Sequence, residues 1–320
     1  MQEMVLEAHV DILLHTYIAG VVKEGDVVKG LELLNKSGKQ TILASVVIDA
    51  TGDADVCDFA GAQMLEKPHV QNSSILFVMT GVDTERLAKA LEEGDHVGGW
   101  GWWHSRIVSA RKIDAAEETH VHIAGHFLPW DDDPSEVTFT SVSVREGEVY
   151  LNATRTVNID ATDAESLTKG EIAERRNIKR LVDGLRKHVP GFAHAYVSRT
   201  SPLGIRESRT VVGDYLLQSD DVLLHREFPD SVVRGAYPSD IHDPRGGRTQ
   251  FLFIEGGGNY GIPYRCFLPK GLEGLMVAGR AISATQKANG TIRLQGTVMA
   301  QGQAVGTAAA QVGEFEGAKD

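Results

Sequence analysis

The sequence predicts an α/β protein in which a domain with buried parallel strands is interrupted by an inserted α+β domain built on an antiparallel sheet. Apolar runs at residues 44–50 and 275–278 both stop at a glycine turn, as parallel strands do at the ligand-binding edge of a sheet. Residues 137–144 and 148–158 instead alternate apolar and polar side chains, which is typical of antiparallel strands. These patterns distinguish the two domains.

The domain boundaries follow from a change in the pattern of predicted strands and helices at Gln63 and a return to the first pattern at Ile262. We expect residues 1–62 and 262–320 to form the first domain, and residues 63–261 to form the inserted one. A chain of 320 residues is long enough for two ordinary domains, each with a core of its own.

Composition narrows the class of protein. Hydrophobic residues make up 42% and charged residues 24% of the chain, as in a soluble globular protein. The net charge of -12 argues against a nucleic acid or an anionic membrane as partner, because either would require a basic face. We therefore expect neither a nucleic acid nor a membrane as a partner.

The two cysteines, Cys57 and Cys266, lie far apart and have no metal-ligand spacing around them. They fit a reducing compartment and exclude an iron–sulfur cluster held by four thiolates of this chain. No apolar run approaches the roughly 18 residues of a membrane span. The first residues carry charges through their apolar part, unlike a signal peptide. The expected location is the cytoplasm.

The first domain begins with a short helix and a series of strands. We expect a helix at residues 1–8, then strands at 12–17, 20–34, 40–43 and 44–50. The turn signal Glu24-Gly25-Asp26 divides the second of these segments into a hairpin.

The inserted domain mixes strands and helices. We expect strands at residues 74–80, 137–144, 148–158 and 195–199, a short helix at 84–93, and a long helix to about His188. Acidic residues at 163–165 cap the long helix, and Pro190-Gly191 ends it. Glu146-Gly147 should join the second and third strands as an antiparallel hairpin.

After the strand at 275–278 and a polar loop, an Ala/Gly/Gln-rich helix begins near Arg293. It contains Gly296, Gly302 and Gly306, each costing about 1 kcal/mol inside a helix. We expect Gly296 to admit a ligand at the helix start, and the other two to bring the helix close to a sheet. The alternative is a tightly packed core helix with no ligand.

Two patterns resemble known sites but have simpler explanations. Residues 256–261 match a dinucleotide-binding glycine pattern, yet Pro263 and its extended-type neighbours follow where a helix is required. His120, His122 and His126 could share a face of a strand as metal ligands. No carboxylate or cysteine completes that set, so we expect ordinary surface or cleft histidines and no metal site.

Arg206, Glu207 and Arg209 lie beside a glycine turn. A guanidinium here could orient a carboxylate or polarise a carbonyl, and a structural ion-pair network is the alternative. His242 lies in a loop between prolines with Asp240 and Asp243 nearby to set its tautomer. It is therefore a candidate acid or base.

Four motifs in order along the chain resemble those of a known family. They are VVIDATGDADV, GIRESRTVVGDY, GIPYRCFLPKG and GLMVAGRAISAT…GTIR…GQAVGTAAA. Together they resemble the FAD-dependent oxidoreductases of the glutathione-reductase-like superfamily, in particular the heterodisulfide-reductase-subunit-A-like group. The resemblance spans nearly all of the chain. It implies a partial FAD-binding, Rossmann-like, three-layer domain with the α+β domain inserted as the substrate domain.

The resemblance also implies a set of residues that close around FAD. These are Thr51, Gly52, Asp53, Gly279, Arg280, Leu294, Gln295 and Gly296. In such a site the first three approach the cofactor from one side, the Gly279-Arg280 turn lies near its ribityl and diphosphate, and the last three lie near the pyrimidine edge of the flavin. This last placement agrees with the dipole of a helix N-terminus.

The chain departs from the family at its start. The family begins with a strand, a GxGxxG turn and a helix that hold the ADP half of FAD, and none of the residues here supplies them. The sequence therefore resembles the C-terminal part of a longer flavoprotein: a truncated reading frame, one subunit of a split enzyme, or a degraded gene. We expect weak or absent FAD binding by the isolated chain.

The leading hypothesis is an FAD-dependent oxidoreductase, or the C-terminal portion of one, that transfers a hydride between the flavin and a small polar metabolite. Arg206 would hold or polarise the substrate, and His242 would donate or accept the proton. Tyr264 and Arg265 would line the cleft. The alternative is a non-catalytic partner subunit that completes a split flavoprotein with a separate N-terminal half.

Overall fold

The computed structural model describes residues 2–87, 106–109, 121–127, 137–140, 145–242 and 250–317. The chain forms two compact units. Unit 1 comprises Met1–Pro68, Glu207–His242 and Arg248–Asp320, and unit 2 is principally His69–Arg206. The chain thus returns to its first unit at Glu207, well before the boundary at residue 262 that the sequence suggested.

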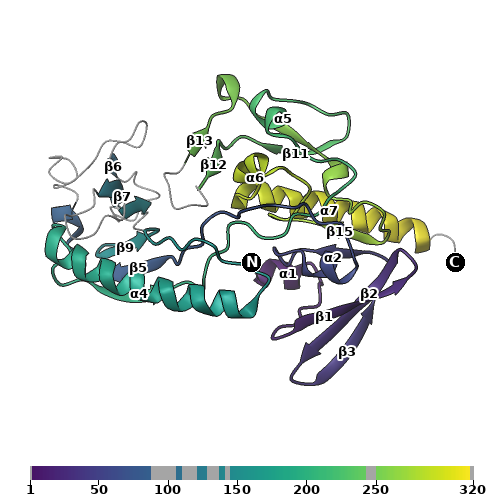
Figure 1. Ribbon diagram of the computed structural model, residues 1–320, viewed down its shortest axis with the longest axis horizontal. Helices are drawn as coiled ribbons and strands as arrows, with labels where there is room; N and C mark the ends of the chain where they lie inside the picture. Colours follow the sequence, from purple (N-terminus) through teal and green to yellow (C-terminus); the bar gives the residue numbers. More distant parts are fainter. Residues whose placement is uncertain are drawn as a thin grey trace. The chain divides into compact units, whose positions relative to one another are not determined.

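Unit 1 begins with α1 (Gln2–Glu7) and an antiparallel meander of β1 (Tyr17–Glu24), β2 (Val27–Asn35) and β3 (Gly38–Leu43), drawn in purple in Figure 1. Gly25 turns the first hairpin with φ of 62°. Gly30 lets the strands approach, since a Cβ there would lie 2.1 Å from the Ile42 carbonyl oxygen. The predicted helix, hairpin and third strand are confirmed.

The predicted strand at residues 12–17 is wrong. The strand begins only at Tyr17, and Leu13 and Leu14 are 55% and 63% exposed. A run of apolar residues becomes a strand only where a neighbouring strand binds its backbone. Within the described residues no strand pairs with this segment.

A short parallel pair lies at the centre of unit 1. β4 (Val47–Asp49) and β15 (Leu275–Val277) pair in register, with Val277 opposite Asp49. The Val47 amide and the Ala278 amide extend the ladder through the carbonyls of Gly274 and Asp49. The two parallel strands predicted from the apolar runs are confirmed, and they are neighbours, so that Thr51-Gly52 and Gly279-Arg280 follow adjacent strands. Two turns remote in sequence therefore meet at one edge.

Two helices follow β15: α6 (Gln286–Ile292) and α7 (Gln295–Gly317), the latter yellow in Figure 1. The long helix was predicted, but α6 occupies the expected polar loop. Its Asn289 and Thr291 are fully buried, because the Asn289 amide donates to the Arg280 carbonyl at 2.6 Å and the Thr291 hydroxyl to the Tyr237 carbonyl at 2.6 Å. Buried hydrogen bonds, which no local pattern reveals, make this polar segment part of the core.

The expected close packing at Gly302 and Gly306 is wrong. Both glycines are exposed, and a Cβ at either would meet no atom within 4 Å. α7 instead buries the face that carries Gln301 and Val305. The positions of the glycines in the sequence therefore did not identify which face of α7 packs against the core.

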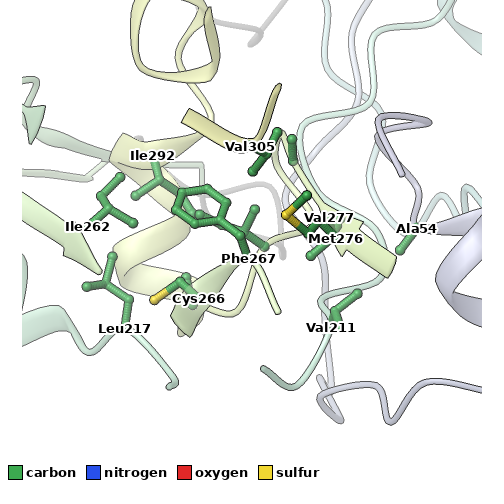
Figure 2. Packing of buried hydrophobic residues seen from close by; sticks show 14 of the residues in the cluster. Ala54, Val211, Leu217, Ile262, Cys266, Phe267, Met276, Val277, Ile292 and Val305 are labelled. Carbon is green, nitrogen blue, oxygen red and sulfur yellow. The ribbon is translucent and has the colours of Figure 1, made fainter. Parts of the chain in front are cut away.

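The core of unit 1 joins segments from all three of its chain sections, as Figure 2 shows. Phe267, Met276, Val277 and Ile292 are each at most 4% exposed, and Val305 of α7 packs against the same cluster. This core fixes the ends of β4 and β15 relative to α6 and α7.

The remaining elements of unit 1 surround this core. They are α2 (Asp55–Phe59), α5 (Ser219–Leu223), β11 (Ser231–Gly235), β12 (Ser239–Ile241), β13 (Gln250–Leu252), the 3₁₀ turns η1 (Glu255–Gly257) and η2 (Tyr264–Cys266), and β14 (Tyr260–Pro263). β11 pairs with β14 and β12 with β13, both antiparallel. Because β14 follows η1, the glycine pattern at 256–261 leads into a strand and not a helix, as predicted.

Unit 2 contains a sheet ordered β10–β5–β9, formed by Tyr196–Thr200, Phe77–Thr80 and Glu148–Leu151. Helix α4 (Ala164–His188) shares its core, which includes Phe77, Leu151 and Leu185. Asp163 caps the helix by accepting from the Ser166 amide at 2.7 Å. The long helix and its acidic cap are confirmed.

A second sheet of unit 2 is ordered β6–β7–β8, formed by Arg106–Ser109, Val121–Phe127 and Val137–Thr140. β8 pairs with β7, and β9 with β5. Both predicted strands therefore exist, but the expected hairpin between them is not found among the described residues. Residues 84–87 are helical, and the rest of the helix predicted at 84–93 lies outside the described part.

Candidate functional site at the carboxyl edge of the parallel strands

The turn after β4 is organised by Asp49, a buried carboxylate that the sequence patterns did not single out. One oxygen accepts from the backbone amide and the hydroxyl of Thr51, at 3.0 and 2.7 Å. The other accepts from the Cys57 amide at 2.9 Å. The Thr51 hydroxyl in turn accepts from the Asp55 amide at 3.0 Å. These bonds hold Thr51-Gly52 between the strand end and α2.

The turn after β15 meets it through an ion pair. Arg280 binds Asp53 at 2.5 Å, both side chains being three-quarters buried. Gly52 has φ of 85°, and a Cβ there would lie 2.4 Å from an Arg280 guanidinium nitrogen. The structure therefore brings together Thr51, Gly52, Asp53, Gly279 and Arg280, which we name the turn cluster.

Gln301 of α7 fastens the helix to the turn cluster. Its buried side-chain oxygen accepts from the Gly279 amide at 2.8 Å, and its nitrogen donates to the Ile292 carbonyl at 2.9 Å. Leu294 is half-buried, and Gln295 and Gly296 are exposed at the start of α7. They lie about 9 Å along the helix axis from Gln301, at 1.5 Å per residue.

A buried ion pair lies beside the turn cluster. Lys67 and Glu207 are 3.2 Å apart, with side chains only 8% and 1% exposed. Gln286 donates to the second Glu207 oxygen at 3.0 Å, and Lys67 also binds the Ser208 carbonyl and the Thr210 hydroxyl. Burial lowers the pKa of Lys67, which the charge of Glu207 counteracts.

Arg209 contacts the turn cluster at Asp53 and the neighbouring helix α2. It donates to the Asp53 carbonyl at 3.1 Å and pairs with Asp55 and Asp58 at 3.0 and 2.9 Å. For Glu207 and Arg209, the structure therefore shows the ion-pair network that was the alternative to a substrate contact.

His242 lies in unit 1 near Asp240, with a distance of 3.4 Å between the His242 Nε2 and a carboxylate oxygen. Arg293 donates to the Asp240 carbonyl at 3.1 Å and lies 3.5 Å from its carboxylate. Burial lowers the pKa of Arg293, against the raising effect of Asp240. Asp243, the other expected neighbour, lies outside the described residues. Arg293 was not predicted, although it belongs to the GTIR motif.

The hydrogen bonds of the Tyr264 and Arg265 side chains go to residues outside the turn cluster. The Tyr264 hydroxyl donates to the Met276 sulfur at 3.3 Å, and burial raises the pKa of Tyr264. Arg265 makes a bidentate pair with Asp230, at 2.9 and 3.1 Å, and its guanidinium lies 5.1 Å from the Tyr215 ring centroid. The pair with Asp230 lowers the pKa of that carboxyl.

Arg206 belongs to unit 2. It donates to the Asn72 carbonyl at 2.7 Å and to the Asn152 side-chain oxygen at 3.4 Å. The Asn72 side-chain amide is buried, and neither its nitrogen nor its oxygen is hydrogen-bonded within the described residues. Glu174 of α4, also fully buried, accepts from the Thr156 hydroxyl. Burial raises the pKa of Glu174, while the charge of Arg206 lowers it.

The sequence matches the family model described as FAD dependent oxidoreductase over residues 1–314. The chain belongs to the FAD-dependent oxidoreductase family. A search of curated proteins found no match.

Three solved structures resemble the chain at low sequence identity. A geranylgeranyl bacteriochlorophyll reductase-like protein from Thermoplasma acidophilum has 14% identity and a TM-score of 0.33, and the match covers 67% of this chain and 41% of that one. CabE, an aromatic hydroxylase from angucycline biosynthesis, has 13% identity and a TM-score of 0.32, with 67% and 33% covered. The p-nitrophenol 4-monooxygenase PnpA from Pseudomonas putida DLL-E4 has 12% identity and a TM-score of 0.31, with 62% and 38% covered. The matches span less than half the length of these three proteins.

Arg280 and the residues that follow it, up to Asn289, fit a polar cofactor in this member of the FAD-dependent oxidoreductase family. Four buried side-chain atoms make no hydrogen bond within the described part of the chain: Arg280 Nε, Ser283 Oγ, Thr285 Oγ1 and Asn289 Oδ1. Each such group costs about 1–3 kcal/mol unless a partner satisfies it. A guanidinium, two hydroxyls and an amide oxygen suit the polar edges of a flavin, its ribityl hydroxyls or its phosphates.

The described residues contain no cluster of metal ligands and no exposed thiol. No three His, Cys, Asp or Glu side chains of that part gather as metal ligands. His122 and His126 lie in β7, and His120 lies outside the described residues. Cys57 and Cys266 are free and buried, and burial raises the pKa of both thiols, that of Cys266 to about 12. Among the described helices, none combines the length and apolarity needed to cross a membrane.

Proposed function

We propose that this chain contributes the flavin-contacting edge and the substrate domain of an FAD-dependent oxidoreductase, which transfers a hydride between FAD and a small polar metabolite. The observation that carries the proposal is the pairing of β4 with β15, which brings the two halves of the turn cluster together. The segment that follows, residues 280–289, adds four buried polar atoms that have no hydrogen bond within the described residues. We infer that β4 and β15 belong to a Rossmann-like FAD-binding domain, since ligands bind at the carboxyl ends of parallel strands.

The turn cluster would hold FAD mainly through Arg280. Its guanidinium is fixed by Asp53, so it loses little freedom when it binds a ligand. Ser283 and Asn289 would supply further hydrogen bonds, and Thr51-Gly52 and Gly279 would bring the backbone close to the cofactor. Leu294, Gln295 and Gly296 would approach the flavin from the start of α7. When bound, FAD supplies the hydride-accepting or hydride-donating N5 position. The protein supplies orientation, exclusion of water and proton handling.

Arg206 would bind the substrate in unit 2. Its two bonds to Asn72 and Asn152 orient the guanidinium. The Asn72 side-chain amide, which has no hydrogen bond in the described part of the chain, adds a donor and an acceptor beside it. A guanidinium next to an amide suits a carboxylate or a carbonyl oxygen. The proposed substrate class is therefore a polar metabolite that carries such a group.

His242 would donate or accept a proton at its imidazole, with Asp240 selecting the tautomer. Tyr264 and Arg265 are the least supported of the proposed cleft residues, because their hydrogen bonds go to Met276 and Asp230.

The second candidate function is a partner subunit that completes a split flavoprotein with a separate chain. Exposed apolar side chains favour it: Leu13, Leu14, Tyr17 and Leu43 are 55% to 77% exposed. Tyr17 and Leu43 belong to the outer strands β1 and β3 of the meander, and Leu13 and Leu14 precede β1. Each of these outer strands has one strand neighbour among the described residues. Apolar surface of this kind is typical of a surface that another chain covers.

Visible absorption of the purified protein tests both candidates. Expressed alone, the chain should retain little flavin; expressed with any adjacent reading frame that encodes a GxGxxG unit, it should purify as a yellow complex. Stoichiometric FAD in the chain purified alone would contradict the proposal that the chain is one subunit of a split flavoprotein. A colourless complex that takes up no added FAD would contradict the flavoprotein proposal itself.

A further inference from the structure

Unit 2 has an open groove between α4 and β10, whose lining includes none of the residues assigned above. Its volume is about 390 Å³, and eight residues line it: Arg175, Ile178, Lys179, Val182, Asp183, Arg186, Val197 and Thr200. Ile178 and Val182 are buried and Val197 is half-buried, so these three form an apolar floor. Three of the remaining five residues are basic and one is acidic.

The groove lies beside the edge of a sheet. In the order β10–β5–β9, β10 has a strand neighbour on one side only among the described residues. Tyr196, Ser198, Arg199 and Thr200 of this five-residue strand are exposed. An edge strand next to an apolar groove is the arrangement to which an extended peptide can add as a further strand.

The charge of the groove is opposite to that of the chain. Helix α4 carries seven Lys or Arg and four Asp or Glu, whereas the whole chain has a net charge of -12. Two of the arginines are held in place: Arg175 donates to Thr200 at 3.3 Å and is also paired with Glu171, and Arg186 donates to the Ala195 carbonyl at 2.6 Å. Lys179 lies between them in the sequence and is exposed. Arg186 and Lys179 therefore present positive charge beside the strand edge.

We propose that the groove between α4 and β10 binds an extended acidic segment of a partner protein. The segment would pair with the edge of β10 that has no strand neighbour among the described residues. It would place apolar side chains on Ile178, Val182 and Val197, and carboxylates near Lys179 and Arg186. Edge-to-edge pairing of two copies of this chain is disfavoured, because it would bring the same basic residues together. The inference does not depend on FAD binding.

The test uses the full chain and a fluorescent synthetic peptide of about eight residues, the length of a typical strand, that alternates Glu with Val. Fluorescence anisotropy should show saturable binding that weakens with salt, as contact between opposite charges requires. A peptide with Pro in place of two Val should fail to bind, because it cannot complete the backbone ladder. No binding of the first peptide at about 1 mM, the weak end of specific affinity, would overturn the proposal.

A charge reversal with a matched control locates the site. Lys179→Glu should weaken binding by about fivefold to tenfold, since it converts an attraction into a repulsion. Arg176→Glu makes the same change on the same helix at a residue outside the groove lining, and it should leave affinity within about twofold. Equal losses in the two variants would show a general charge effect and overturn the site. So would a concentration-dependent dimer that Lys179→Glu dissolves, since the occupant would then be a second copy.

Discussion

Gly52 shows how a single backbone position shapes the candidate site. Its φ of 85° is unfavourable for other residues, and its hydrogen faces Arg280 where a methyl group would collide. Gly38 has φ of 100° in an exposed turn, and a Cβ there would meet no atom within 4 Å. A substitution at Gly38 therefore measures backbone strain alone, whereas a substitution at Gly52 measures strain together with a steric clash.

We expect Gly38→Ala to lower the free energy of unfolding by about 1 kcal/mol through strain alone. Gly52→Ala should cost more and should also weaken FAD binding, because it displaces the guanidinium of Arg280. Denaturant unfolding and flavin titration of both variants measure the two effects. Equal stability losses with unchanged flavin affinity in both would show that Gly52 has no steric role.

Glu174 gives unit 2 a pH dependence. Burial raises its pKa above the ordinary value of 4.5. A carboxyl with a raised pKa contributes stability that is complete below 4.5 and is lost as pH rises through the higher folded-state value. Glu174→Gln should remove this loss, so the stability of the variant relative to wild type should increase as pH rises above 4.5.

Melting midpoints measured across a pH series test this expectation. Glu165→Gln is the control, since Glu165 lies on the same helix, is exposed and pairs at the surface with Lys169. If wild type and Glu174→Gln show the same dependence on pH, the buried carboxyl does not titrate as described.

At the scale of elements, Gln301 connects α7 to the turn cluster and to the end of α6. Gln301→Leu keeps similar volume but leaves the Gly279 amide and the Ile292 carbonyl without their partner. The expected cost is about 2–4 kcal/mol for two unsatisfied buried groups. Gln303→Leu, at an exposed position of the same helix, should cost less than about 0.5 kcal/mol. Chemical denaturation compares them, and similar costs would contradict the bridging role.

Elements could be predicted from the sequence where the local pattern of apolar and capping residues agrees with the packing in the fold. The apolar runs ending at Gly52 and Gly279 predicted the correct parallel pair, and the acidic cap at Asp163 predicted the correct start of α4. The errors arose where distant contacts override local pattern: exposed Leu13 and Leu14 lack a strand partner in the described residues, and buried Asn289 is polar yet part of the core.

The candidate site was predictable only in part, for the same reason. The motifs located Thr51, Gly52 and Arg280, but not the long-range partners that position them. Asp49, Gln301 and the pair of Lys67 with Glu207 become visible only when segments far apart in the sequence are placed side by side.

At the scale of the whole molecule, we propose that unit 1 binds the cofactor and unit 2 contributes a substrate contact. Unit 1 holds the parallel strands and the turn cluster, and unit 2 holds Arg206 on an antiparallel sheet and helix framework. The family assignment supports the proposal that FAD binds at the turn cluster, and so do the four buried polar atoms of unit 1 that lack hydrogen bonds among the described residues. This is the central claim.

Titration of FAD against the purified chain, followed by quenching of flavin fluorescence, tests that claim most directly. Wild type should bind weakly and saturably, and Arg280→Ala should bind at least about tenfold more weakly, because it removes a charged donor and leaves Asp53 without this ion pair. Arg234→Ala removes an arginine that is paired at the surface with Glu227, and this variant should bind like wild type. Equal affinity of wild type and Arg280→Ala would contradict the claim.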